Sequence, residues 1–168
     1  VAKEKSIDVV IRQMPALLQK LPNAKFLIVG NGPVKKDLEE LCKELNVENS
    51  VIFAGEQPWD IIGKFYQAGD VFVSASVTET QGLTFAEAMA AKMPVVAKQD
   101  KSIEGIIQDH INGRVFTEDE ELANILFELL TQKEVSIQLA ENAAAMVEPL
   151  SSTHFGENIE KIYLSLIN

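Results

Sequence analysis

The stretch AKFLIVGNGPVKKDLEELCKELNVENSVIFAG, residues 24–55, decides the fold class because its hydrophobic period changes twice. Residues 24–30 form a short apolar run that ends in glycine, which is typical of a strand buried on both faces. Residues 34–47 repeat apolar side chains at three- and four-residue spacing, which indicates an amphipathic helix with Pro33 near its first turn. Residues 50–55 form a second apolar run. This order predicts a parallel strand–helix–strand unit.

The alternation of strands and helices continues on both sides of this unit. Outside it, the hydrophobic pattern predicts these elements: helix 6–20, helix 59–69, strand 70–76, a helix ending at about Lys92, strand 93–98, a short helix 102–109, a short strand 113–116, and helical segments from Glu118 to the C-terminus. We therefore predict one α/β domain over residues 1–168, with a terminal helix in 151–168. Its sheet is expected to be parallel, doubly wound and Rossmann-like, with helices on both faces.

Composition limits the class of function. Hydrophobic residues make up 46% of the chain and charged residues 24%, as in globular proteins. The formal net charge of -10 argues against a nucleic-acid partner, which would require a basic surface. No apolar run approaches the ~20 residues of a membrane-spanning helix, and the N-terminus lacks a signal-peptide pattern. We expect a soluble, cytoplasmic domain, although a small basic patch that contacts a membrane is compatible with the acidic total.

The single cysteine and the two histidines give no sign of a metal site. Cys42 cannot form an internal disulfide, and its place in a helical pattern predicts a small buried side chain. His110 and His154 stand apart from each other, in a predicted loop and at a predicted helix start, where solvated or capping roles are expected. No cluster of His, Asp and Cys suggests metal ligands, so we predict no metal.

Two loops follow predicted strands and contain unusual chemistry: GNGP (30–33) and VTETQGLT (77–84). In doubly wound folds, ligands bind at the carboxyl ends of the strands, where helix N-termini converge. Gly30 and Gly32 would let the backbone approach an anionic ligand closely. The dinucleotide fingerprint G-x-G-x-x-G would need a third glycine at Lys35, so that function is rejected. A tight turn without a ligand remains an alternative for this first loop.

The second loop belongs to TETQGLTFAEA (78–88), in which Glu79 and Glu87 flank Gly82. Gly82 would allow a sharp turn into a helix, with the N–H groups of Gly82, Leu83 and Thr84 directed at a phosphate. A carboxylate can accept both hydrogens of a vicinal diol. Two carboxylates on either side of a phosphate site would therefore suit a nucleotide sugar, in which a diphosphate separates ribose from hexose.

Two alternatives explain the glutamates without this ligand. Thr84 and Glu87 fit a capping box, in which threonine caps the helix and glutamate bonds back to the cap's N–H. A catalytic acid/base pair is the other alternative, and we rank it last because it gives no reason for the glycine.

The segment SVTETQGLTFAEAMAAKMPVVA (76–97) resembles the E-x7-E signature of the retaining glycosyltransferases of group 1, or family 4, which have the two-domain GT-B fold. The resemblance extends in the family's order over nearly the whole chain, through AKEKSID (2–8), FLIVGNGP (26–33), VIFAGEQPWDIIGKFYQAGDVFVSAS (51–76) and HINGRVF (110–116). Several motifs in one order make the match specific.

The resemblance implies roles for individual residues. Glu79 matches the glutamate that binds hydroxyls of the donor hexose, and Glu87 matches the one that binds the ribose diol. Lys5 matches the lysine that neutralises the diphosphate leaving group. The remaining donor-binding positions act mainly through their backbone: Gly32 beneath the donor, Gly55 and Glu56 at the nucleobase, and Gly82, Leu83 and Thr84 at the phosphate and sugar. The implied reaction is sugar transfer with retention of configuration, with Lys5 and Glu79 as catalytic residues and no cofactor beyond the nucleotide-sugar substrate.

The resemblance covers only the C-terminal, donor-binding half of such an enzyme. We expect an N-terminal acceptor domain as its partner, and donor binding with little or no transfer by this chain alone. The family's arginine just ahead of the lysine segment would precede Val1, and Lys92 stands where the family usually has glycine.

The substrate is suggested by the motif TETQGL, which is similar to that of bacterial enzymes that glucosylate diacylglycerol. This predicts UDP-glucose as donor and a diacylglycerol-type membrane lipid as acceptor, bound through the other domain. In the full-length protein it also predicts peripheral attachment at the inner membrane face. The alternatives are a non-catalytic sugar-nucleotide-binding or regulatory module, a nucleotide-sugar epimerase, and a purely structural domain.

Overall fold

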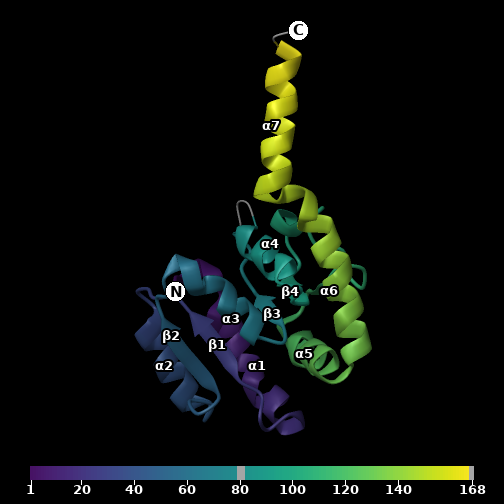
Figure 1. The fold of residues 1–168 in the computed structure, drawn as a ribbon. Helices are drawn as coiled ribbons and strands as arrows, with labels where there is room; N and C mark the ends of the chain where they lie inside the picture. Colours follow the sequence, from purple (N-terminus) through teal and green to yellow (C-terminus); the bar gives the residue numbers. More distant parts are fainter. Residues whose placement is uncertain (79–81, 167–168) are drawn as a thin grey trace.

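Helices and strands follow one another in the predicted order, except that the helix predicted between the last two strands does not form. The computed structural model describes residues 1–78 and 82–166. Its elements (Figure 1) are α1 Ile7–Lys20, β1 Phe26–Val29, α2 Lys35–Glu44, β2 Val51–Gly55, α3 Ile62–Ala68, β3 Phe72–Ser74, α4 Leu83–Ala90, β4 Val95–Lys98, β5 Arg114–Phe116, α5 Leu122–Thr131, α6 Lys133–Val147 and α7 Ser152–Leu166. Short 3-10 turns precede α1, α3 and α5. The α/β class is confirmed.

All the strand pairs in the described residues are parallel, but the hydrogen-bonded ladders form two sheets where the sequence predicted one. One sheet has the order β1–β2, and the other has the order β3–β4–β5. The two sheets share a hydrophobic core, since Ile28 of β1, Val96 of β4 and Phe116 of β5 belong to one cluster of buried side chains. Side-chain packing therefore joins the sheets.

Strand β4 shows why the fold is doubly wound. Val95, Val96 and Ala97 are each 0% exposed, so both faces of the strand are covered. Val96 packs into a cluster with side chains of α1, α2 and α5. Val95 and Ala97 pack into a second cluster with side chains of α4 and α6. Alternate residues of a strand point to opposite faces, so helices cover both faces of this sheet, as predicted.

The predicted helix 102–109 does not form. Lys101–Ile103 make a single 3-10 turn, which Asp100 caps by accepting a hydrogen bond from the Ser102 N–H at 2.8 Å. Gly105 follows with φ of +80°, a left-handed conformation that ends helical propagation. The apolar spacing of this segment reflects Ile103 and Ile107, which are buried beside α4, and not a helical period.

The terminal helix predicted in 151–168 is α7. It projects away from the body beyond α6 (Figure 1), and its apolar side chains Phe155, Ile162, Tyr163 and Leu166 are exposed. None of the helices in the described residues is long and apolar enough to cross a membrane.

Cys42 lies on α2 and is buried, as predicted, with 1% of its surface exposed. Burial raises the pKa of its thiol, and the nearby charges of Glu39 and Glu48 raise it further. A raised thiol pKa leaves little reactive thiolate at neutral pH. Cys42 is therefore a packing residue.

The backbone conformation of Lys92 explains why glycine would suit the end of α4. Its φ is +56°, in the left-handed region. The Met93 N–H donates to the Ala88 carbonyl at 3.0 Å and the Lys92 N–H donates to the Met89 carbonyl at 2.9 Å, which is the Schellman pattern. The residue at this position of the pattern adopts a left-handed conformation, which glycine tolerates best. Lysine here carries backbone strain.

Replacing Lys92 with glycine should therefore stabilise the domain. We expect Lys92→Gly to raise the free energy of unfolding by about 0.5–1 kcal/mol, because relief of the left-handed strain exceeds glycine's extra entropy in the unfolded chain. Urea unfolding followed by circular dichroism measures the change. Lys92→Ala is the matched control, since it removes the same charge and keeps the Cβ. Equal stability of the two variants would contradict the strain argument.

Candidate functional site

The first glycine loop and the loop after β2 meet at the carboxyl edge of their sheet. The Gly30 N–H donates to the Gly55 carbonyl at 2.7 Å, directly beyond the β1–β2 ladder. Gly30 and Gly55 both have positive φ, so the two chains can turn at this contact. Glu56 follows with an exposed side chain. Gly32 and the Gly55–Glu56 segment, which the family resemblance assigned to one site, are thus held at the same edge.

The N-terminal segment lies against this edge. The Val1 nitrogen donates to the Asn31 carbonyl, and a Cβ at Gly32 would lie 2.1 Å from the Val1 carbonyl oxygen. Only glycine therefore permits the observed approach of the two backbones. The nearby 3-10 turn Lys3–Lys5 places Lys5 with an exposed side chain.

The Lys5 segment also reaches the loop that follows β3. The Thr78 hydroxyl lies 3.5 Å from the Glu4 carbonyl, to which it donates a long hydrogen bond. Glu4, the residue before Lys5, thus contacts Thr78, the residue just ahead of Glu79, although the sequence separates them widely. Glu79 itself lies outside the described residues.

Gly82 makes the sharp turn that the sequence predicted. It is the N-cap of α4 with φ of +62°, and its carbonyl accepts hydrogen bonds from the Phe85 and Ala86 N–H groups at 3.0 and 3.1 Å. Leu83 and Thr84 form the first turn of the helix and are exposed. N–H groups in a first turn have no partner within the helix and carry its positive partial charge. This geometry can accept an anion.

The capping-box alternative for Glu87 is wrong. Helix α4 begins at Leu83, so Thr84 is already inside the helix, and the cap residue Gly82 has no side chain with which to make the box. The Glu87 Oε2 atom instead accepts a hydrogen bond of 2.7 Å from the Tyr66 hydroxyl of α3. The carboxylate is half-buried and lies one turn into α4.

Tyr66 is a residue that the sequence analysis missed. Its ring packs at 6.0 Å from that of Phe72, which in turn meets Phe85 edge-on at 5.5 Å. Burial raises the pKa of the Tyr66 hydroxyl, and the hydrogen bond to Glu87 and that residue's charge raise it further. The hydroxyl thus stays protonated and acts as a donor at neutral pH. In the sequence, the position of Tyr66 within the apolar pattern of the predicted helix 59–69 indicates only a packed side chain. No sequence motif pairs Tyr66 with Glu87.

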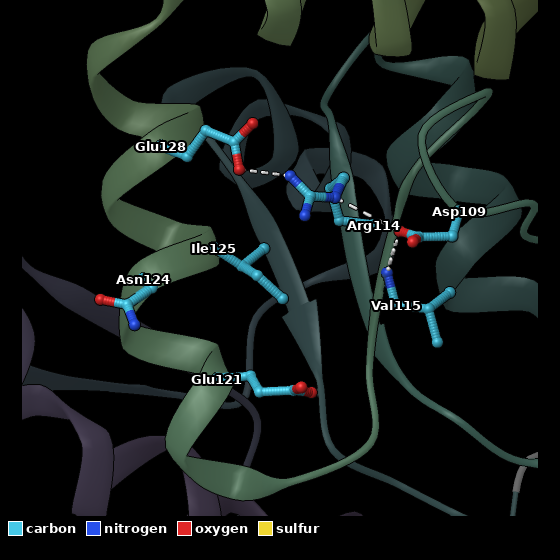
Figure 2. A pocket seen from close by; sticks show the side chains of 7 residues that line it. All are labelled: Asp109, Arg114, Val115, Glu121, Asn124, Ile125 and Glu128. Atoms are coloured by element: carbon cyan, nitrogen blue, oxygen red, sulfur yellow. Dashed lines mark hydrogen bonds and ion pairs between the residues drawn. The ribbon is translucent and has the colours of Figure 1, made fainter.

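A depression lies between β5 and α5, and none of the glycine-loop residues lines it. Figure 2 shows its lining, which consists of Asp109, Arg114, Val115, Glu121, Asn124, Ile125 and Glu128. It is organised by the Arg114 side chain, which is 10% exposed.

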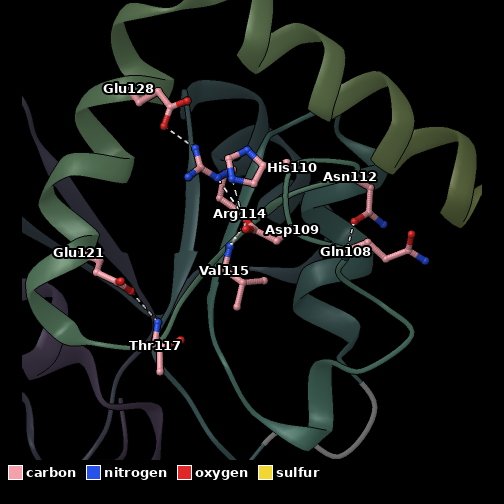
Figure 3. Close-up of polar contacts among 9 residues, drawn as sticks. All are labelled: Gln108, Asp109, His110, Asn112, Arg114, Val115, Thr117, Glu121 and Glu128. Atoms are coloured by element: carbon pink, nitrogen blue, oxygen red, sulfur yellow. Dashed lines mark hydrogen bonds and ion pairs between the residues drawn. The ribbon is translucent and has the colours of Figure 1, made fainter.

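Arg114 is neutralised by carboxylates on both sides. Its Nε lies 3.3 Å from Asp109 Oδ1, and its Nη1 bonds to Glu128 Oε2. Asp109 Oδ1 also accepts from the Val115 N–H at 2.9 Å, so one carboxylate holds both side chain and backbone of β5 (Figure 3). His110, which lies 3.4 Å from the other Asp109 oxygen, has its expected loop position. Because each charge has a partner, we interpret this cluster as structural.

Loss of Arg114 should destabilise the fold. We expect Arg114→Met to lower the free energy of unfolding by about 2 kcal/mol, because it leaves the partly buried Glu128 carboxylate and the more exposed Asp109 carboxylate without their cation. Arg12→Met is the matched control, since the pair that Arg12 makes with Asp8 at 3.9 Å is exposed and worth about 0.5 kcal/mol or less. Urea midpoints measure both. Equal losses in the two variants would contradict the structural role of Arg114.

A protein-family model described as "Glycosyl transferases group 1" matches residues 1–146 of the chain. The chain belongs to this family. Two relatives are alpha-monoglucosyldiacylglycerol synthases, one from Acholeplasma laidlawii and one from Streptococcus pneumoniae. The first is 33% identical over 100% of this chain and 42% of its own length, and the second is 30% identical over 99% and 37%. The chain thus spans less than half the length of these relatives.

Solved structures share the fold, among them the C-terminal domain of a glycosyl transferase group 1 family protein (LpcC) from Francisella tularensis, with a TM-score of 0.79 and 28% identity over 88% of this chain and 80% of its own. A mutant of S. aureus TarM, in a complex that contains UDP, matches with a TM-score of 0.84 and 28% identity over 98% of this chain and 33% of its own. This group 1 glycosyltransferase domain is therefore a Rossmann-like half of a GT-B fold, as the resemblance implied. Among residues 1–78 and 82–166, no three His, Cys, Asp or Glu side chains are placed to hold a metal ion.

Proposed function

We propose that this chain is the C-terminal, donor-binding part of a two-domain retaining glycosyltransferase that transfers glucose from UDP-glucose to a diacylglycerol-type lipid. One observation carries the proposal. The Glu87 carboxylate is not used as a helix cap and lies one turn from Gly82, at the anion-accepting end of α4. An acceptor of diol hydrogens beside an anion site suits a nucleoside diphosphate.

The donor lies across the carboxyl edge of the strands. Its diphosphate meets the N–H groups of Gly82, Leu83 and Thr84, and its ribose diol donates to Glu87. The nucleobase rests on the main chain at Gly55 and Glu56, and Gly32 allows close approach of the first loop.

Catalysis in this proposal is electrostatic stabilisation of the leaving group. Lys5 balances the negative charge that grows on the nucleoside diphosphate as the sugar departs, and Glu79 orients the hexose through its hydroxyls. Such a mechanism requires neither a metal nor a nucleophile from this domain. The acceptor enters from the N-terminal domain, with which this chain forms the complete site.

The names of the two relatives support the choice of substrates, since both are alpha-monoglucosyldiacylglycerol synthases. The UDP in the complex of S. aureus TarM supports a uridine donor. A lipid acceptor requires access to a membrane surface, so we place the full-length protein in the cytoplasm and peripherally at the inner membrane face.

Calorimetric titration of the chain with UDP, ADP, GDP and UDP-glucose tests donor binding. We expect UDP to bind, and Glu87→Gln to weaken UDP about tenfold or more, because it removes a charged acceptor of the ribose hydroxyls. Glu79→Gln should weaken UDP-glucose and leave UDP unchanged. Glu160→Gln, on the exposed side of α7, is the control for loss of a carboxylate.

Two results would overturn the assignment. Failure of UDP to bind to the folded chain would reject a donor site, and unchanged UDP affinity in Glu87→Gln would reject the role of Glu87. Transfer itself is tested with the two-domain protein, UDP-glucose and vesicles that contain diacylglycerol. If the donor binds but neither lipid nor soluble acceptors are glucosylated, the domain is a non-catalytic sugar-nucleotide module.

A further inference from the structure

We propose that Tyr66 positions the Glu87 carboxylate for the ribose diol, by occupying one of its oxygens and leaving the other for the nucleotide. This inference rests on the proposed function and adds a residue from a different helix to the site. Tyr66 is a positioning residue, since its hydroxyl acts on the ligand through Glu87.

The hydrogen bond joins two helices at one carboxylate. The Tyr66 hydroxyl of α3 donates to Glu87 Oε2 of α4 at 2.7 Å, a length typical of a strong O–H to carboxylate bond. A glutamate side chain has several rotatable bonds, so an unheld carboxylate would lose rotamer freedom each time the ligand binds. Fixing Oε2 in the free protein removes part of that cost.

The tyrosine ring is itself fixed by the core. It meets the Phe72 ring of β3 at a centroid distance of 6.0 Å, and Phe72 meets Phe85 edge-on at 5.5 Å. Phe85 is 0% exposed and lies two residues before Glu87 on α4. This row of three rings sets the separation of α3 and α4, and thereby the place of the hydroxyl relative to the carboxylate.

The chemistry leaves room for the ligand. An ionised carboxylate has about four lone-pair positions, and the tyrosine hydroxyl uses one on Oε2. Oε1 and the remaining position on Oε2 can accept the two hydrogens of a vicinal diol. Tyrosine serves better here than lysine or arginine would, because a neutral donor does not cancel the negative charge that attracts the diol hydrogens.

The test compares UDP with 2′,3′-dideoxyuridine diphosphate, which lacks the diol. In the wild-type chain, Glu87 should make UDP the tighter ligand. Tyr66→Phe keeps the ring and its packing and removes only the hydroxyl. We expect this variant to bind UDP about tenfold more weakly, while its affinity for the dideoxy ligand stays within about twofold of wild type.

The two ligands separate this proposal from the one on which it depends. If the wild-type chain binds both ligands equally, Glu87 does not bind the ribose diol, and the proposed function of that residue is wrong. If wild type prefers UDP and Tyr66→Phe keeps the whole preference, only the role of Tyr66 is overturned. Equal weakening of both ligands would also overturn it, since a general loss of structure does not depend on the diol.

Matched variants complete the test. Tyr163→Phe makes the same chemical change on α7, where the side chain is 66% exposed, and should alter neither affinity. In the double variant Tyr66→Phe with Glu87→Gln, the loss of UDP affinity should equal that of Glu87→Gln alone, because the hydroxyl acts only through the carboxylate. Fully additive losses would overturn the proposal. Thermal unfolding of each variant verifies that the fold is intact.

Discussion

Burial of β4 on both faces is the constraint on which the other elements depend. Val95, Val96 and Ala97 are completely covered, each on the face that the pleat assigns to it. One face requires the side chains of α1, α2 and α5, and the other requires those of α4 and α6. Each fully buried valine contributes about 1.5 kcal/mol or more, so these helices must dock on the faces where they are found.

Docking of α4 on β4 in turn locates the candidate site. Phe85, Ala88 and Met89 of α4 are 0% exposed, which fixes both the rotation of the helix and its height on the sheet. Gly82 then begins the helix at the carboxyl edge, and Glu87 lies on the side that meets α3. Glycine suits this start because its φ of +62° is left-handed, and because a Cβ here would lie 3.0 Å from the end of the Ile106 side chain.

Two hydrogen-bonded carboxylate clusters differ in the partner that holds the carboxylate, and this difference distinguishes a structural cluster from a candidate ligand-binding one. Glu128 and Asp109 both bond to one cation, Arg114, which offsets part of their negative charge. Glu87 faces the neutral hydroxyl of Tyr66, so its charge is held in position without being cancelled. A carboxylate that is held in position without a cation, next to a helix N-terminus, is the arrangement expected of a ligand-binding group, whereas carboxylates paired with a cation tie a strand to a helix.

The order of the elements and the location of the glycine turns could be predicted from sequence. The spacing of apolar residues and the left-handed conformation that glycine allows both determine the backbone over only a few neighbouring residues. The helical pattern that runs from Glu118 to the C-terminus, which contains α6, and the turn at Gly82 are examples. The prediction of a helix over 102–109 was wrong. The apolar residues of this segment pack against α4, which is remote in sequence, and their spacing does not reflect a helical period. Thr84 and Glu87 also fit a capping box by spacing, and only the backbone, which starts α4 at Leu83, decided against it.

The bonds of Glu87 to Tyr66 and of Arg114 to Glu128 join different elements, so no local pattern specifies them. Sequence determined what can happen within one turn or strand, and tertiary packing decided which side chains meet, since that depends on how helices settle on the buried faces of the sheet.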